Sequence, residues 1–290
     1  MWQRYWKRSL LFLERLRREV AYDDVMGMSA QIAYYMLLSL IPFLIFVLSI
    51  MSRMEIGVSL APLLLETLRE QMPPEAANYI VDIVMRVLPT QSGQTTVVSF
   101  AVSLWGSSMA IGALITTINR AYNLRPRRNI AIQKLMSLGL VLVLSAILLM
   151  AMTILLFGEQ YTQRLFVFLG LADRSNTFWT SIRLPLAGAL AVIALAILYY
   201  YAPEARQRFK HILPGTVTAA VLWLAASSAF RLFVSEFGNY NVTYGSLAAV
   251  VILLAYFWLT GFIFLLGAEV NALMKRFEFE EGRDLYRPLR

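Results

Sequence analysis

Glu269 stands out in this sequence because it is the one carboxylate inside the long apolar runs of the chain. It lies in the segment 267–271 (GAEVN), about one helical turn from the inner boundary of the last run. An ionisable side chain in a membrane-spanning helix is costly and often marks a path for ions or substrate. Glu269 therefore has two interpretations. It carries a proton or cation, or it forms a structural ion pair with Arg120 or another basic residue.

A polar segment, 235–246, separates the last two apolar runs and is rich in hydrogen-bonding side chains. Its members are the amides Asn239 and Asn241, the phenols Tyr240 and Tyr244, and the flexible Gly245. These groups offer more hydrogen-bonding capacity than a reversal of the chain needs. The segment could gate the outer end of a substrate path, or it could be a capped turn with tyrosines at the membrane interface.

The first apolar run carries polar residues on one helical face. Gln31, Tyr35 and Ser39 recur at intervals of four, and Pro42 follows about one turn later on the same side. Such a face should be buried or water-lined. Pro42 also frees a main-chain carbonyl near Leu38, which could act as a hinge or bind a passing solute; the alternative is a kink that serves packing alone.

The second apolar run has a stripe of small residues and ends in a basic loop. Ser108, Gly112 and Thr116 recur at intervals of four, which favours close packing of helices, and Asn119 marks the inner end. The loop suits phosphate-bearing lipid headgroups. The candidate headgroup-binding residues are Arg120, Arg125, Arg127 and Arg128.

Composition places the chain in a membrane. Of 290 residues, 59% are hydrophobic and 15% are charged, and the mean hydropathy is +0.61. There is no cysteine and a single histidine, His211, so disulfides, thiolate sites and multi-histidine metal sites are excluded. We expect no metal and no cofactor.

The apolar runs predict an all-α fold, a bundle of six transmembrane helices. A run of about 20 residues crosses a bilayer as a helix. The predicted parts are an amphipathic interfacial helix at 1–23, a transmembrane domain at 24–273 and a cytoplasmic tail at 274–290. The spans are 29–52, 96–119, 135–157, 178–201, 214–234 and 244–273, with an extracytoplasmic helical insert at 54–95 and a short loop at 158–176.

Basic residues set the predicted topology. If successive loops alternate between two sides, most of the 26 Lys and Arg residues fall on the side that holds both termini, including those from Arg120 to Lys134. The positive-inside rule places that side in the cytoplasm. The net charge of +8 is therefore interpreted as a topology signal and an attraction to anionic membrane lipids, not as a nucleic-acid surface.

Five separated motifs resemble the YihY/BrkB family of bacterial inner-membrane proteins over nearly the whole chain. They are 29–42 (SAQIAYY and LSLIP), 105–122 (WGSS and INRAY), 214–215 (PG), 237–247 (FGNY and TYGSL) and 267–271 (GAEVN). Tyr34 stands where the family usually has phenylalanine. The resemblance implies a six-span protein of the plasma (inner) membrane with both termini inside. It implies no agreed activity, although members carry names from serum resistance and from ribonuclease BN.

A ribonuclease, or any other enzyme, is not what these residues predict, because the chain has neither a histidine pair nor a cluster of metal-binding acids. The leading hypothesis is a transporter of a lipid-like or anionic amphiphilic substrate in envelope homeostasis. In this hypothesis the basic loop binds the headgroup of the substrate, and the helical face that contains Gln31 lines the substrate path. The tip at 239–246 opens and closes the outer end of that path. The alternatives are a non-transporting assembly protein, with an envelope partner or as a homo-oligomer, and an exporter of ions or small solutes.

Overall fold

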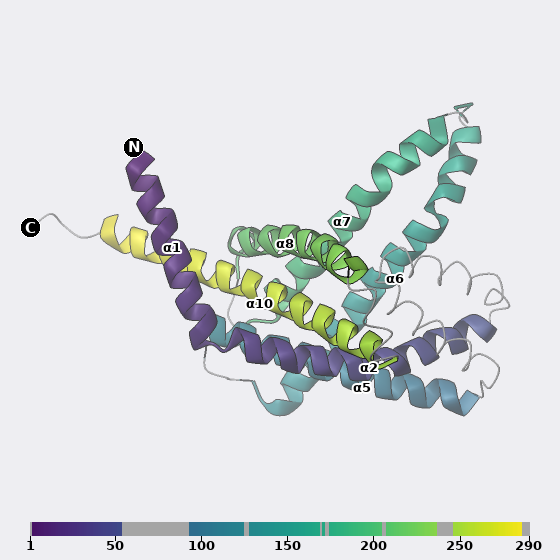
Figure 1. Ribbon diagram of the computed structural model, residues 1–290, viewed down its shortest axis with the longest axis horizontal. Helices are drawn as coiled ribbons and strands as arrows, with labels where there is room; N and C mark the ends of the chain where they lie inside the picture. Colours follow the sequence, from purple (N-terminus) through teal and green to yellow (C-terminus); the bar gives the residue numbers. More distant parts are fainter. Residues whose placement is uncertain are drawn as a thin grey trace, which may run out of the picture.

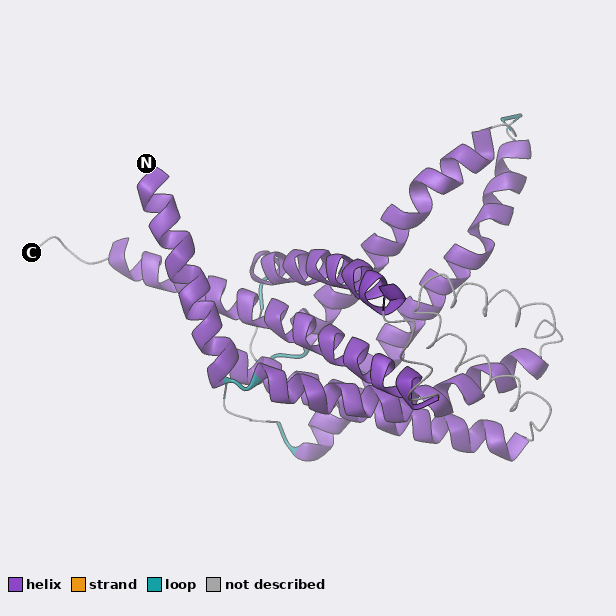
Figure 2. Ribbon diagram, viewed as in Figure 1, coloured by secondary structure: helices purple, strands orange, loops and turns teal. Residues whose placement is uncertain are grey.

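The computed structural model describes residues 2–53, 93–124, 128–168, 170–171, 174–204, 207–236 and 246–285. This part of the chain is helical and contains no strand (Figures 1 and 2). Its helices are α1 (Trp2–Tyr22), α2 (Val25–Arg53), α5 (Gly93–Ala121), α6 (Ile130–Phe168), α7 (Ser175–Tyr201), α8 (Phe209–Glu236) and α10 (Ser246–Leu285). The predicted all-α class is confirmed.

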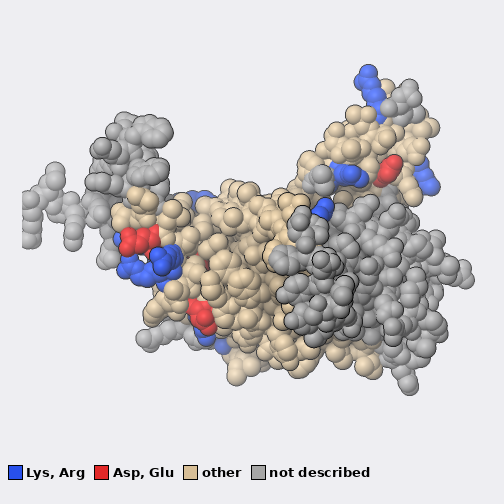
Figure 3. Space-filling model, viewed as in Figure 1, with Lys and Arg blue, Asp and Glu red and all other residues tan. Residues whose placement is uncertain are grey.

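Hydropathy and length make most of these helices membrane spans. Among the described residues, five stretches are long and apolar enough to cross a bilayer: Val97–Ala121, Ile130–Leu155, Ser175–Tyr201, Phe209–Val234 and Val250–Phe277. Val25–Leu40, within α2, is a shorter apolar helix. On the face drawn in Figure 3, charged side chains gather at the end with both termini and towards the tip of the α6–α7 hairpin. Few appear between them, as a membrane-embedded belt requires.

Two helix ends differ from the sequence prediction. α6 continues to Phe168, through most of the expected loop 158–176, and packs there against α7, where Trp179 is buried over Gly158. α10 continues to Leu285, through much of the expected tail. In both places the helix extends beyond its apolar run. A helix is held by hydrogen bonds within its own backbone, and polar residues can continue it in water. The insert at 54–95 lies outside the described residues except for the start of α5.

The bundle is built around α2, α5, α8 and α10, which run side by side, while the α6–α7 hairpin leans away from them (Figure 1). Small residues allow this packing. A side chain on Gly267 of α10 would lie 2.8 Å from both the main-chain oxygen of Gly215 and the Cβ of Ala219 on α8. Gly106 of α5 similarly faces Ser39 of α2, so a close contact of α5 lies two residues from Ser108, off the predicted stripe of small residues.

A sharp corner joins α1 to α2. Asp24 adopts a positive φ of 50°, and its carboxylate accepts a hydrogen bond of 3.2 Å from the main-chain N–H of Gly27, in the first turn of α2. The corner turns α1 away from α2, and α1 crosses α10, where the rings of Phe12 and Phe277 lie 5.8 Å apart between centroids (Figure 1). It also places Asp23, which precedes the turn, against α10.

Candidate functional site

Asp23 and Glu269 form a buried pair of carboxyl groups. Their exposed fractions are 5% and 1%, and their side chains are in hydrogen-bonding contact. Asp23 Oδ2 and Glu269 Oε1 have no hydrogen-bond partner among the described residues. Two ionised carboxylates are acceptors only, so a hydrogen bond between them requires one of the pair to hold a proton.

The surroundings of Asp23 make its ionised form less favourable than it is in water. Burial raises the pKa of Asp23 above its ordinary value, and the negative charge of Glu19 raises it further. The hydrogen bond with Glu269 and the charges of Arg276 and Arg120 act in the opposite direction without reversing the result. At Asp23 the corner between α1 and α2 therefore meets α10 through a contact between two carboxyl groups.

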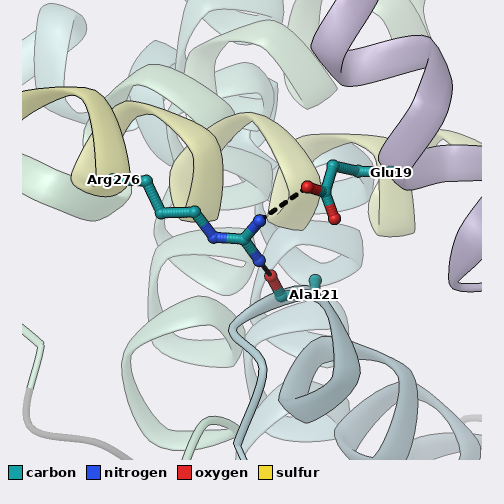
Figure 4. A network of polar contacts seen from close by, with 3 residues as sticks. All are labelled: Glu19, Ala121 and Arg276. Atoms are coloured by element: carbon teal, nitrogen blue, oxygen red, sulfur yellow. Dashed lines mark hydrogen bonds and ion pairs between the residues drawn. The ribbon is translucent and has the colours of Figure 1, made fainter. Parts of the chain in front are cut away.

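Arg276 lies close to this pair but binds elsewhere. Its guanidinium donates to Glu19 Oε1 at 2.7 Å and to the main-chain oxygen of Ala121 at 2.6 Å (Figure 4). It thus ties α10 to α1 and to the last residue of α5. Arg120 is exposed, and neither arginine forms an ion pair with Glu269. The ion-pair interpretation of Glu269 is replaced here by the contact with Asp23.

Further polar groups surround the inner half of α10. The Tyr122 hydroxyl has no partner in the described structure, and burial together with the nearby Glu269 raises the pKa of Tyr122. The Lys275 ammonium lies 5.5 Å from the centre of the Tyr122 ring and donates to Gln207 Oε1 at 3.2 Å. Five side chains of this region therefore have a buried polar atom without a partner in the described structure. They are Asp23, Tyr122, Gln207, Glu269 and Asn271.

Two side chains fix the backbone beside this group. Asn271 Oδ1 accepts a hydrogen bond of 2.6 Å from the N–H of Gly215, near the start of α8. The hydroxyl of Tyr199, from α7, donates to the main-chain oxygen of Phe264 at 2.6 Å. Both bonds span helices that lie far apart in sequence, so they hold α7 and α8 against α10 at the level of Glu269. We therefore define the inner polar site as Asp23, Glu269, Tyr122, Gln207 and Asn271.

Asn119 and Arg128 both bind Glu204, which follows the end of α7. Asn119 is buried, and its Oδ1 accepts from the N–H of Glu204 at 2.8 Å. The N–H of Arg128 donates to Glu204 Oε2 at 3.1 Å, and its guanidinium reaches the oxygen of Ala202. These two predicted site residues thus connect the α5–α6 loop to the end of α7. Arg125 and Arg127 lie outside the described residues.

The polar face of α2 is only partly buried. Gln31 is exposed, Tyr35 and Pro42 are half-buried, and Ser39 is buried with its hydroxyl donating to the main-chain oxygen of Met36 at 3.0 Å. Ser39 therefore packs against Gly106 without presenting a free donor. The tip residues Asn239, Tyr240, Tyr244 and Gly245 lie outside the described ranges. Of the predicted motifs, the one that contains Glu269 and Asn271 contributes to the inner polar site. The predicted polar face of α2 does not.

Sequence reasoning missed the partners of Glu269. The sequence predicts Asp23 as the last residue of an interfacial helix and places Tyr122 at the end of a family motif. One signal could have found them. Asp23 precedes the first predicted span and Tyr122 follows the second, so both lie at the same predicted side of the membrane as Glu269. Within the described ranges, no three His, Cys, Asp or Glu side chains gather as a metal site would require.

The fold and this buried site define an integral, multi-pass membrane protein of the helical-bundle class. The model of the Virulence factor BrkB family matches residues 16–287, and the chain belongs to this family. The predicted YihY/BrkB membership is thereby confirmed.

Named relatives support the same assignment. A ribonuclease-like protein, YfkH, of Bacillus subtilis is 29% identical over 265 residues, covering 91% of this chain and 95% of its own. A UPF0761 membrane protein of Photobacterium profundum is 26% identical over 297 residues, covering 96% and 86%. Another, of Vibrio vulnificus, is 25% identical over 281 residues, covering 92% and 83%. No solved structure matches the chain.

Proposed function

We propose that this protein is a membrane transporter whose substrate movement is linked to a proton held between Asp23 and Glu269. The observation that carries the proposal is the buried carboxyl pair, which has an unpartnered oxygen on each side and no ion pair to Arg276 or Arg120. A pair kept only for stability would be expected to use the nearby arginines. Membrane proteins place such incompletely neutralised acids on proton and ion paths.

The position of the pair suggests how the proton would act. Asp23 belongs to the corner between α1 and α2, and Glu269 belongs to α10. With a shared proton the two carboxyl groups attract each other, whereas two ionised carboxylates in direct contact repel each other. Loss of the proton would therefore separate the corner from α10 and give the bundle a second arrangement, as a transporter needs.

Several parts of this proposal extend beyond the family assignment. The charge pattern and the resemblance support an inner-membrane location with cytoplasmic termini, and the charge pattern supports contacts with anionic membrane lipids. The role in envelope homeostasis is part of the transport proposal. The lipid-like substrate rests on the basic residues at the inner ends of the helices. The alternative, a non-transporting protein that presents 54–95 to an envelope partner, depends on residues outside the described ranges.

The proposal is tested by proton flux in proteoliposomes that contain a pH-sensitive dye and carry an imposed membrane potential. Wild-type protein should admit protons faster than protein-free vesicles do, and Glu269→Gln should abolish the difference. Glu14→Gln is the matched control, because Glu14 is an exposed acid on α1 that pairs with Arg18 at 4.0 Å. Equal flux in wild type and Glu269→Gln, with both proteins folded and inserted, would remove the pair from the mechanism.

A further inference from the structure

Lys134 places a positive charge inside the bundle. It lies near the start of α6, and its Nζ donates to Ser108 Oγ on α5 at 2.6 Å. Ser108 is 1% exposed and stands midway along the span Val97–Ala121. The ammonium therefore reaches the middle of a membrane-crossing segment.

The charge on Lys134 has no acidic partner in the described structure, where Ser108 is the one residue to which it bonds. Ser108 cannot neutralise it, because a hydroxyl is uncharged; its oxygen accepts from Lys134 while its own proton is donated to the main-chain oxygen of Trp105 at 2.7 Å. A lysine ammonium has three donors, so two remain for another acceptor. An uncompensated charge at this depth is costly, and membrane proteins keep one where it meets a ligand or a counter-charge.

The usual behaviour of a lysine near a helix end does not account for this arrangement. Such a side chain normally extends towards the headgroups, which lie near Ile130, the first residue of α6. Its neighbour Gln133 bonds to Thr116 of α5 at 3.2 Å, whereas Lys134 bonds to α5 eight residues earlier. Because α5 rises about 1.5 Å per residue, Lys134 bonds about 12 Å farther from the inner end of α5 than Gln133 does.

The surface beside Lys134 is apolar. Trp105, one turn from Ser108, is 56% exposed, and Leu135 is 70% exposed. In a membrane these side chains face acyl chains, so a ligand that reaches the half-buried Lys134 from this side must itself be partly apolar. The single ammonium matches a single negative charge.

We propose that Lys134, positioned by Ser108, binds the singly charged phosphate of an anionic amphiphile, such as a phosphodiester lipid. The inference rests on the proposed transport function and names the class of substrate. Lys134 Nζ supplies the positive charge and the two N–H donors that its bond to Ser108 leaves available. The acyl chains lie along Trp105 and Leu135.

The test measures lipid selectivity in nanodiscs of phosphatidylcholine that contain spin-labelled phosphatidylglycerol or spin-labelled phosphatidylcholine. Electron paramagnetic resonance gives the fraction of each lipid that is immobilised by the protein. Wild type should prefer phosphatidylglycerol, and Lys134→Met should lose about fivefold in that preference, the usual effect of one basic residue near anionic lipid. Lys134→Arg should retain it, which separates loss of charge from loss of fold.

Lys210→Met is the matched control, because Lys210 is an exposed lysine at the start of α8, at the same end of the bundle. It measures what a lysine at the surface contributes, and Lys134→Met should lower the preference more than Lys210→Met does. Equal selectivity in wild type and Lys134→Met would overturn the site, and displacement of the labelled lipid by inorganic phosphate would show a free-anion site instead of an amphiphile site. The measurement uses no proton gradient. Preserved selectivity in a protein that conducts no protons would therefore refute the proposed function alone.

Discussion

Replacing Arg276 with glutamine should destabilise the inner end of the bundle and loosen α1. The guanidinium joins three helices, since it bonds to Glu19 of α1 at 2.7 Å and to the oxygen of Ala121, the last residue of α5, at 2.6 Å (Figure 4). The side chains of Arg276 and Glu19 are 29% and 26% exposed. This intermediate burial makes the contact stronger than a surface ion pair and weaker than a fully buried one.

The expected loss of free energy of unfolding lies between the values known for exposed and for buried ion pairs. An exposed ion pair contributes about 0–1 kcal/mol, and removal of one partner from a buried pair costs about 3–5 kcal/mol. A hydrogen bond from a charged group contributes about 1.5–3 kcal/mol, and the bond to Ala121 is of this kind. Arg276→Gln should therefore lower the free energy of unfolding by about 2–3 kcal/mol.

The assay is reversible unfolding in mixed micelles, followed by the fluorescence of an introduced label on α1. Arg18→Gln provides the control, because Arg18 pairs with Glu14 at 4.0 Å and both side chains are more than 70% exposed. That variant should change the free energy of unfolding by less than about 0.5 kcal/mol. If Arg276→Gln and Arg18→Gln had the same effect, the three-helix contact would not stabilise the protein.

Two further predictions follow from the same region. Burial raises the pKa of Asp23, so the folded state binds its proton more tightly than the unfolded state, and stability should fall as pH rises above about 4. Asp23→Asn should flatten that part of the pH profile, measured by unfolding at several pH values; an unchanged slope would contradict the assignment. Gly267→Ala should cost about 1–3 kcal/mol, because the new Cβ meets the Gly215 oxygen, whereas Gly188→Ala in α7, with open space around it, should cost nothing. Equal melting temperatures for the two alanine variants would show that α8 and α10 separate easily.

The helices were predictable because hydropathy is a local property of the sequence. Every predicted span overlaps a described helix, since a run of about 20 apolar residues in a bilayer must satisfy its backbone internally. The ends were less predictable. α6 reaches Phe168 and α10 reaches Leu285 because helical hydrogen bonding continues where the apolar pattern stops.

The site was predictable only in part. Glu269 could be found because an acid contrasts with its apolar neighbours, whereas Asp23 lies among charged residues and carries no such contrast. Their contact depends on the corner at Asp24 and on how α10 packs, which no local pattern encodes. Lys134 was counted among the basic residues that set topology. Its bond to Ser108 depends on where α6 crosses α5, and that crossing is a tertiary property.

α5 connects the two charged features of the bundle. Its last residue, Ala121, accepts the bond from Arg276 beside the carboxyl pair, and Ser108, thirteen residues earlier, accepts the bond from Lys134. Between and beyond them α5 packs closely on α2, where a Cβ on Gly106 would lie only 3.0 Å from that of Ser39. Close packing of this kind does not deform gradually, so helices shift as units. If loss of the shared proton displaces α2 at Asp23, α5 must follow, and the amphiphile site at Lys134 changes with it. A proton at one end of α5 and a headgroup near its middle would then be linked through a single rigid helix.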